Sequence, residues 1–184
     1  MTKKLTLQDR ADLYARAFPK FPPLMVSGKW LYGMWILGNN YKGSGYYGAY
    51  PPAYLKRITT LFPDCPRVLH LFSGSLPDGD YVKLDVRDGN GDAENIPYGA
   101  NSFDIIYADP PYSIEDAVHY GKPMINRKKV LAECRRILSP KGFLVWLDQV
   151  LPMYRKIEWE LCGTIGMVRS TNHRVRTVFI FRKR

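Results

Sequence analysis

One short segment limits the possible folds of this sequence more than any other. Residues 103–108, Phe-Asp-Ile-Ile-Tyr-Ala, form a mostly apolar run without the alternation expected of a strand that has one face in solvent. Such a run is typical of a strand buried on both faces of a parallel sheet. Asp109-Pro110-Pro111-Tyr112 follows at once, and prolines cannot continue the hydrogen-bond ladder of a central strand. The sequence therefore predicts a central parallel strand that ends at residue 108.

Strand and helix patterns alternate along the chain on both sides of this run. Residues 127–138 have apolar side chains at helical spacing, and Ser139-Pro140-Lys141-Gly142 is predicted to end this helix as a turn. The last part of the chain predicts a hairpin around Ser170-Thr171-Asn172. The alternation indicates an α/β fold with a mostly parallel sheet, helices on both faces and a C-terminal antiparallel hairpin. Further strands are expected at residues 67–72, 81–86 and 143–148.

The first third of the chain is rich in aromatic residues and glycine. A chain of 184 residues is expected to form one domain, here with an aromatic and helical segment at 1–62 and an α/β core at 63–184. The expected features of the first segment are a helix over 7–18 capped by Thr6 and a short strand or loop over 30–50 with turns at Asn39-Asn40 and Gly43–Gly45. A second helix is expected to have Pro51 or Pro52 in its first turn and to end before Pro63.

Composition excludes several classes of protein. Apolar residues at 46% indicate a folded chain, and no stretch approaches the roughly 20 apolar residues of a membrane span. The N-terminus lacks the apolar centre of a secretory signal, so we expect a cytoplasmic protein without membrane contact. Cys65, Cys134 and Cys162 form no metal-binding pair and are expected to be buried, reduced thiols. His119 and His173 have no partner at ligand spacing, so no metal site is predicted.

Asp109-Pro110-Pro111-Tyr112 has a specific chemical use at the end of a strand. Ligands of open α/β sheets bind at the carboxyl ends of the strands. There the Asp109 carboxylate and the Pro110 carbonyl can accept hydrogen bonds from one exocyclic NH2 group, and Tyr112 offers a flat face for a ring. Two acceptors orient the nitrogen lone pair of a weakly nucleophilic aromatic amine. A base must leave its duplex to enter such a pocket.

These residues resemble the class I methyltransferases that use S-adenosylmethionine, in particular the N6-adenine DNA methyltransferases with a DPPY motif. The resemblance covers roughly residues 43–184 and implies a Rossmann-like methyltransferase sheet. In it, Asp109-Pro110-Pro111-Tyr112 corresponds to the family's catalytic [DNS]-P-P-[YFW] motif, and Asp109 also borders the cofactor. Phe72-Ser73-Gly74 resembles the cofactor-binding turn, Asp85 the acid that binds the cofactor ribose, and Asp92 the residue that meets its adenine amine.

The sequence departs from that family between the first two predicted strands of the core. The family's turn has a second glycine, whereas Ser75-Leu76-Pro77 follows Gly74 here, and only a short stretch separates Gly74 from Tyr81. Parallel crossovers usually need a dozen or more residues. We therefore expect a loop in place of the usual helix. Gly89-Asn90-Gly91 comes so soon after Asp85 that the family's next strand is expected to be short or missing.

The net charge of +10 suggests a polyanionic partner. The segment 169–184 contains no acid, and Arg169, Arg174 and Arg176 are candidates for phosphate contacts. We expect a nucleic acid, DNA rather than RNA, bound by the basic C-terminal hairpin and the aromatic N-terminal segment. Neither loop near the motif has room for a recognition region, so a homodimer or a partner subunit is a further expectation. Candidate stacking residues are Trp30, Trp35, Tyr46, Tyr47 and Tyr50, with core packing as the alternative.

The predicted function is transfer of a methyl group to an exocyclic base amine, with adenine N6 in DNA as the first choice. Three alternatives stay open: an RNA base (adenine N6 or guanine N2), a protein glutamine, or a degenerate methyltransferase fold that only binds nucleic acid or a partner. His119 is predicted to lie on a mobile loop near the target.

Overall fold

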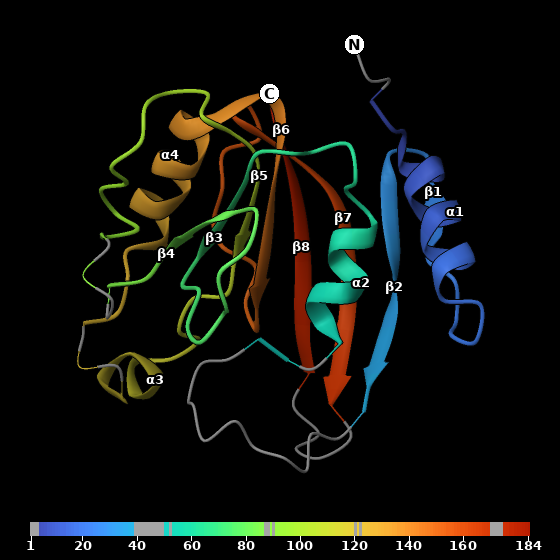
Figure 1. Ribbon diagram of the computed structural model, residues 1–184, viewed down its shortest axis with the longest axis horizontal. Coiled ribbons are helices and arrows are strands. Elements are labelled where there is room, and N and C mark those ends of the chain that lie inside the picture. Colours follow the sequence, from blue (N-terminus) through green and yellow to red (C-terminus); the bar gives the residue numbers. More distant parts are fainter. Residues whose placement is uncertain are drawn as a thin grey trace.

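The computed structural model describes residues 4–38, 50–51, 53–86, 89, 91–119, 121, 123–169 and 175–184. Its centre is a mixed sheet with the strand order β1-β2-β7-β8-β6-β5-β3-β4 (Figure 1). The strands are β1 (Met25–Ser27), β2 (Trp30–Leu37), β3 (Val68–Leu71), β4 (Val82–Leu84), β5 (Phe103–Ala108), β6 (Leu138–Asp148), β7 (Trp159–Arg169) and β8 (Val175–Lys183). The helices are α1 (Leu7–Ala17), α2 (Tyr54–Thr60), α3 (Ile114–His119) and α4 (Arg127–Ile137).

The pairing of the strands confirms the predicted α/β fold class. β4, β3, β5 and β6 are parallel neighbours, so their carboxyl ends lie at one edge of the sheet. β8 lies antiparallel between β6 and β7, which gives the expected C-terminal hairpin. β2 extends the sheet parallel to β7, and β1 pairs antiparallel with β2. The sequence predicted at most a short strand in this region and did not predict that it joins the sheet.

Apolar side chains cover both faces of the sheet. Successive residues of β5 point to opposite faces, so Ile105 and Tyr107 belong to one core cluster and Ile106 and Ala108 to the other. The first cluster contains the apolar sides of α1 and α2, and the second contains that of α4. Helices therefore pack on both faces, as predicted. The first cluster joins side chains of segment 1–62 to side chains of the α/β core.

The predicted helices form, and their caps explain where they start. Thr6 accepts a hydrogen bond from the Asp9 amide and Asp9 bonds back to the Thr6 amide, which is a complete capping box for α1. Asn126 caps α4 through its side chain alone, which accepts hydrogen bonds from the amides of Lys128 and Lys129. α2 forms where expected, but Pro51 precedes it, and Pro52 lies outside the described residues.

β6 is longer than predicted, and the prediction of a turn at 139–142 is wrong. The strand starts at Leu138, directly after α4, and Leu138 pairs with Phe103. The extra residues are absorbed by a register shift against β5, where Lys141 has a φ of 64°. Ser139 Oγ donates to the Phe103 carbonyl at 3.0 Å, so this segment stays attached to the sheet. The four residues therefore form an irregular part of the strand.

The link between β3 and β4 contains no helix in residues 72–81, all of which are described, as expected from its length. After β4, Asp92 and Asn95 form an isolated bridge in place of a further strand. His119 closes the short helix α3, so the expectation of a loop there is wrong. The predicted turns at Asn39-Asn40, Gly43–Gly45 and Ser170–Asn172, and residues Tyr46, Tyr47, His173 and Arg174, lie outside the described residues.

Three further properties bear on the classes of protein considered above. All three cysteines are buried and free, as predicted. No helix within the described ranges combines the length and the apolar character needed to cross a membrane. The same ranges contain no group of three or more His, Cys, Asp or Glu side chains that could hold a metal ion.

Candidate functional site

The Asp109–Tyr112 motif lies immediately after β5, at the edge of the sheet where the parallel strands end. Pro110 is buried, whereas Asp109 and Tyr112 are half-buried. The Tyr112 hydroxyl donates a short hydrogen bond to Oδ1 of Asp109. Oδ2 of Asp109 has no hydrogen-bond partner within the described part of the chain. One carboxylate oxygen is thus fixed by the motif itself, and the other can accept a hydrogen bond from a ligand.

Asp109 holds its proton more tightly than an ordinary aspartate. Burial raises the pKa of its carboxyl from 3.8 to about 6; the Tyr112 hydrogen bond and the Arg176 charge oppose this rise, and Asp148 and Asp116 add to it. A half-buried carboxyl with a shifted pKa at a strand end is typical of a functional group. At neutral pH the group is still mainly ionised, and it can therefore accept hydrogen bonds from an amine.

Three side chains from other elements position Tyr112. The Arg176 guanidinium of β8 lies over the Tyr112 ring, 4.9 Å from Cζ to the ring centroid. Arg127, the first residue of α4, donates from Nη2 to the Tyr112 carbonyl at 3.4 Å and from Nε to Asp148 Oδ2 at 3.1 Å. Asp148 is fully buried at the end of β6 and also accepts from Trp146 Nε1 at 3.1 Å. Tyr112 is therefore held on its face and at its backbone.

Sequence reasoning missed the Arg127–Asp148 pair and assigned Arg176 a different role. One signal for Asp148 was available, because it is an acid that closes a strand at the same edge as Asp109. Arg176 was predicted to contact phosphate; the structure places it against Tyr112. Arg169, on the paired strand β7, remains a predicted phosphate contact.

Phe72, Ser73, Gly74 and Asp85 come together at the ends of β3 and β4. The Gly74 amide donates to Asp85 Oδ2 at 2.9 Å, and the Phe72 amide donates to the Leu84 carbonyl at 3.0 Å. Phe72 and Gly74 have φ values of 56° and 55°, a conformation that costs energy for Phe72. Since β3 lies between β4 and β5 in the sheet, this turn is adjacent to the Asp109 motif.

The turn fits a polar cofactor. Ser73 is 1% exposed, and its Oγ has no hydrogen-bond partner among the residues that the structure describes. A buried hydroxyl without a partner is unfavourable unless a ligand or water completes it. The turn therefore offers a buried hydroxyl next to the Gly74 amide that Asp85 accepts from, and the binding of S-adenosylmethionine by Ser73 and Asp85 stays a prediction from the resemblance.

Asp92 is not brought into this group by any described contact. Its side chain is exposed, and Oδ1 accepts from the Glu94 amide at 2.8 Å within a local turn. The contact between Asp92 and the cofactor adenine stays a prediction from the resemblance.

A series of aromatic contacts links β3 to α2. His70 of β3 is buried, stacks on Tyr107 at 5.1 Å between ring centroids, and has its Nδ1 3.2 Å from the Tyr50 hydroxyl. Burial lowers the pKa of His70 to about 4, so it is neutral at physiological pH. Tyr50 in turn stacks on Tyr54 at 5.6 Å. Trp35 belongs to the core at 0% exposure and cannot stack on a base, which confirms the core-packing alternative for that residue.

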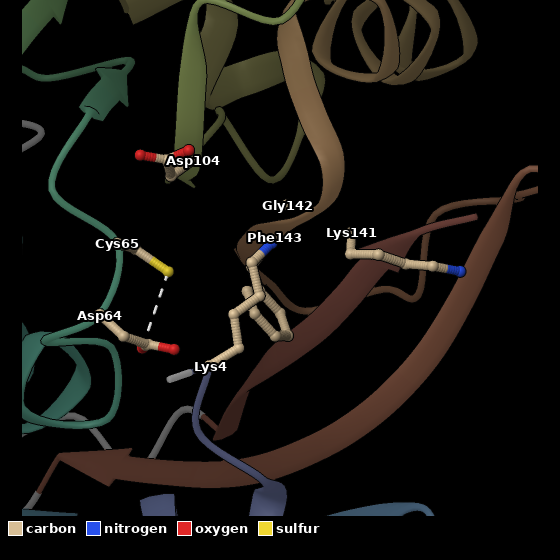
Figure 2. Close-up of a pocket in the computed structure, with 7 residues that line it drawn as sticks. All are labelled: Lys4, Asp64, Cys65, Asp104, Lys141, Gly142 and Phe143. Carbon is tan, nitrogen blue, oxygen red and sulfur yellow. Dashed lines mark hydrogen bonds between the residues drawn. The ribbon is translucent and has the colours of Figure 1, made fainter. Parts of the chain in front are cut away.

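A small cavity lies at the other end of the sheet (Figure 2). It encloses about 30 Å³, roughly the space of one water molecule. Asp104, at the start of β5, borders it, whereas Asp109 follows the end of that strand. The cavity is therefore separate from the motif. Its lining residues are Lys4, Asp64, Cys65, Asp104, Lys141, Gly142 and Phe143.

Comparison with known proteins agrees with this geometry. Residues 78–146 match the protein family described as a methyltransferase domain. The demethylmenaquinone methyltransferase of Thermotoga maritima is 33% identical over 87 residues, which is 47% of this chain and 31% of that protein. The chain thus spans less than a third of the length of this curated relative.

Solved methyltransferase structures resemble the chain at low identity. TrmN from Thermus thermophilus is 15% identical, with 100% of this chain and 50% of that chain covered, at a TM-score of 0.41. The N-methyltransferase NodS from Bradyrhizobium japonicum is 12% identical, with 96% and 93% covered, at a TM-score of 0.43.

The match over residues 78–146 shows that this part of the chain is similar to a methyltransferase domain. The narrower resemblance to DNA adenine methyltransferases stays a prediction.

Proposed function

We propose that this protein transfers the methyl group of S-adenosylmethionine to an exocyclic amine of a nucleic-acid base, adenine N6 in DNA being the first choice. The observation that carries the proposal is the Asp109 carboxylate. One of its oxygens is fixed by Tyr112 and the other has no described partner, and the group is adjacent to the Gly74–Asp85 turn. An acceptor next to a cofactor turn is the arrangement needed to orient an amine for transfer.

The residues of the motif account for the proposed reaction. S-adenosylmethionine supplies a methyl group on a positively charged sulfur, which makes the methyl carbon electrophilic. Asp109 Oδ2 and the Pro110 carbonyl accept the two amine N–H bonds and direct the nitrogen lone pair towards that carbon. The nitrogen–carbon bond forms as the carbon–sulfur bond breaks, and the electron pair stays on sulfur. Asp109, with a pKa of about 6, can then accept the proton released by the nitrogen.

Tyr112 and Arg176 form the wall against which the base would stack. The hydrogen bond from Tyr112 to Asp109 fixes the ring, and the guanidinium covers one of its faces. A base that stacks here must leave its duplex, which is easiest in single strands. Positioning and electrostatic preorganisation supply most of the proposed catalysis.

A nucleic-acid substrate is supported by charge. The chain carries a net charge of +10, and Arg176 of the basic hairpin is already part of the site. Salt should therefore weaken binding strongly. A second copy or a partner subunit that supplies sequence recognition is part of the same proposal.

One observation favours a second candidate. The link between β3 and β4 lacks the helix whose N-terminus would help to hold the cofactor, so the domain could bind nucleic acid without catalysing transfer. Calorimetry with S-adenosylmethionine separates the two candidates, because the second predicts no heat of binding.

The experiment that tests the proposal uses S-adenosylmethionine labelled on the methyl group. Single-stranded DNA, duplex DNA and RNA are each incubated with the wild-type chain, Asp109→Asn, and the control Asp12→Asn, which alters an exposed acid on α1. The proposal expects label in DNA with the wild type and the control, and at least a hundredfold loss with Asp109→Asn. Label in RNA alone would move the substrate to RNA. Equal labelling by Asp109→Asn would contradict the proposed role of the motif.

A further inference from the structure

Tyr54, the first residue of α2, carries a buried hydroxyl that the fold itself does not use. The side chain is 0% exposed, and its Oη has no hydrogen-bond partner in the described part of the chain. Its ring is fixed by stacking on Tyr50 and by an edge contact with Trp35 at 6.3 Å between centroids. Buried polar groups without partners are rare because they reduce stability. A rigidly held, unpaired donor therefore calls for a ligand acceptor.

The fold places Tyr54 on the same side of the sheet as Asp109. Tyr54 and Tyr107 belong to one core cluster, and side chains two residues apart along a strand point to the same face. Asp109 follows Tyr107 by two residues, so it continues that face at the carboxyl edge. Figure 1 shows α2 starting at the edge of the sheet where β2 and β7 end. Tyr54 and Asp109 thus belong to the same face of the sheet, and Tyr50 links Tyr54 to this part of the sheet, because its ring stacks on Tyr54 and its hydroxyl lies 3.2 Å from His70 Nδ1 of β3.

Electrostatic coupling agrees with this placement. Burial raises the pKa of Tyr54 well above 10, and Tyr50, Asp109 and Tyr107 raise it further. The pKa of Tyr112 is in turn raised by burial and by Asp109, with a smaller increase from Tyr54. Burial raises the pKa of Tyr50 well above 10, and the charges of Asp109 and Asp85 add to this rise. Tyr54 is coupled to the two motif side chains that would contact the base, and it stays a neutral donor at physiological pH.

A hydroxyl donor next to a carboxylate that accepts a hydrogen bond from an amine selects bases with a particular arrangement of hydrogen-bonding groups. Adenine presents an acceptor, N1, next to its amino group, and cytosine presents N3 in the same way. Guanine presents an N1–H donor on one side of its amino group, which would oppose the hydroxyl, and the N3 acceptor on the other side. A site with one acceptor and one neighbouring donor therefore recognises an amino group together with an adjacent ring nitrogen that accepts a hydrogen bond.

We propose that Tyr54 is a specificity-determining residue whose hydroxyl donates to the ring nitrogen next to the methylated amine. This inference rests on the proposed function and specifies how the site recognises a base: it requires a ring acceptor beside the methylated amine, as N1 is in adenine and N3 in cytosine. The hydroxyl acts on binding and orientation of the base, and it takes no part in the bond changes.

The test combines a side-chain change with an atom change in the base. Single-stranded oligonucleotides carry one target, either adenine or 1-deazaadenine, in which a C–H replaces N1. Wild type, Tyr54→Phe and the control Tyr98→Phe, a tyrosine that packs on Phe103 at the opposite end of β5, are compared by kcat/KM. Thermal unfolding of each variant is recorded in parallel. Tyr54→Phe removes an unpaired hydroxyl, so it should fold with an unchanged or higher Tm.

The inference expects Tyr54→Phe to reduce kcat/KM on adenine about three- to tenfold, the value of one neutral hydrogen bond. Wild type should lose the same factor on 1-deazaadenine, and Tyr54→Phe should lose nothing further there. Equal activity of Tyr54→Phe and wild type on adenine would overturn the inference and leave the proposed function intact. Equal losses on both bases would also overturn it, because the hydroxyl would then act elsewhere. No transfer by wild type to either base, or to a cytosine target, would overturn the proposed function together with the inference.

Discussion

Replacing Asp109 by Asn is expected to stabilise the fold above pH 6 while it removes activity. The folded chain raises the carboxyl pKa from 3.8 to about 6, mainly through burial. That difference corresponds to about 3 kcal/mol, at 1.36 kcal/mol for each pH unit. Because the side chain is only half-buried, solvent screening reduces this to about 1–2 kcal/mol. Asn keeps the acceptor for the Tyr112 hydroxyl and avoids the cost of a buried charge.

The sign of the pH dependence follows from the raised pKa. The folded state binds the Asp109 proton more tightly than the unfolded state, so the resulting stabilisation is fully present below pH 3.8 and is lost as the pH rises through about 6. Asn has no such dependence. The stability difference between variant and wild type should therefore be near zero at about pH 4 and reach its full value by about pH 8.

Urea unfolding at these two pH values measures the effect. The expected result is a midpoint that is higher for Asp109→Asn at the upper pH only, with unchanged m-values. Methyl transfer, measured on the same samples, should fall at least a hundredfold. A variant that is less stable than wild type at both pH values would refute the reasoning, since Asp109 would then act as a structural acceptor and not as a strained functional group.

Three further changes test contacts that stabilise the fold. Arg10→Ala should lower the free energy of unfolding by about 3–5 kcal/mol, because it leaves the Asp64 carboxylate without its buried bidentate partner at 2.7 and 2.9 Å. The double change Arg10→Met and Asp64→Leu should recover most of this loss. A small effect of Arg10→Ala alone would contradict the role of the pair. Thr6→Ala should cost about 1 kcal/mol through loss of the capping box, and unchanged urea unfolding would count against that cap. Gly163→Ala should cost about 1–3 kcal/mol, because a Cβ there would lie 2.8 Å from the Leu31 carbonyl of β2. Gly38→Ala, which meets nothing within 4 Å, is the matched control, and equal urea midpoints for the two would refute this account of β2–β7 packing.

Local patterns in the sequence predicted the elements that build the site. The apolar run that ends at Ala108 and the two prolines after it determine where β5 stops, so the position of Asp109 was predictable. The short spacing between Gly74 and Tyr81 excluded a crossover helix for reasons of length alone. The capping role of Thr6 could also be predicted from the sequence, because its partner Asp9 is only three residues away.

Contacts between distant segments could not be predicted in this way. Arg127, Asp148 and Tyr112 meet only because α4, β6 and the motif converge at one edge of the sheet. Tyr54 belongs to an N-terminal helix, and its relation to Asp109 depends on which face of the sheet that helix covers. The start of β6 at Leu138 was missed because a proline and a glycine usually end regular structure, whereas here a register shift accommodates them.

The identity of the methylated atom tests the central claim most directly. Single-stranded DNA would be incubated with the purified chain and S-adenosylmethionine that carries a trideuterated methyl group, then digested and analysed by mass spectrometry of its nucleosides. The account predicts trideuteromethyl on an exocyclic base amine, N6 of adenine first, that disappears with Asp109→Asn. Label on a ring carbon or on the sugar, or label that persists in Asp109→Asn, would contradict it.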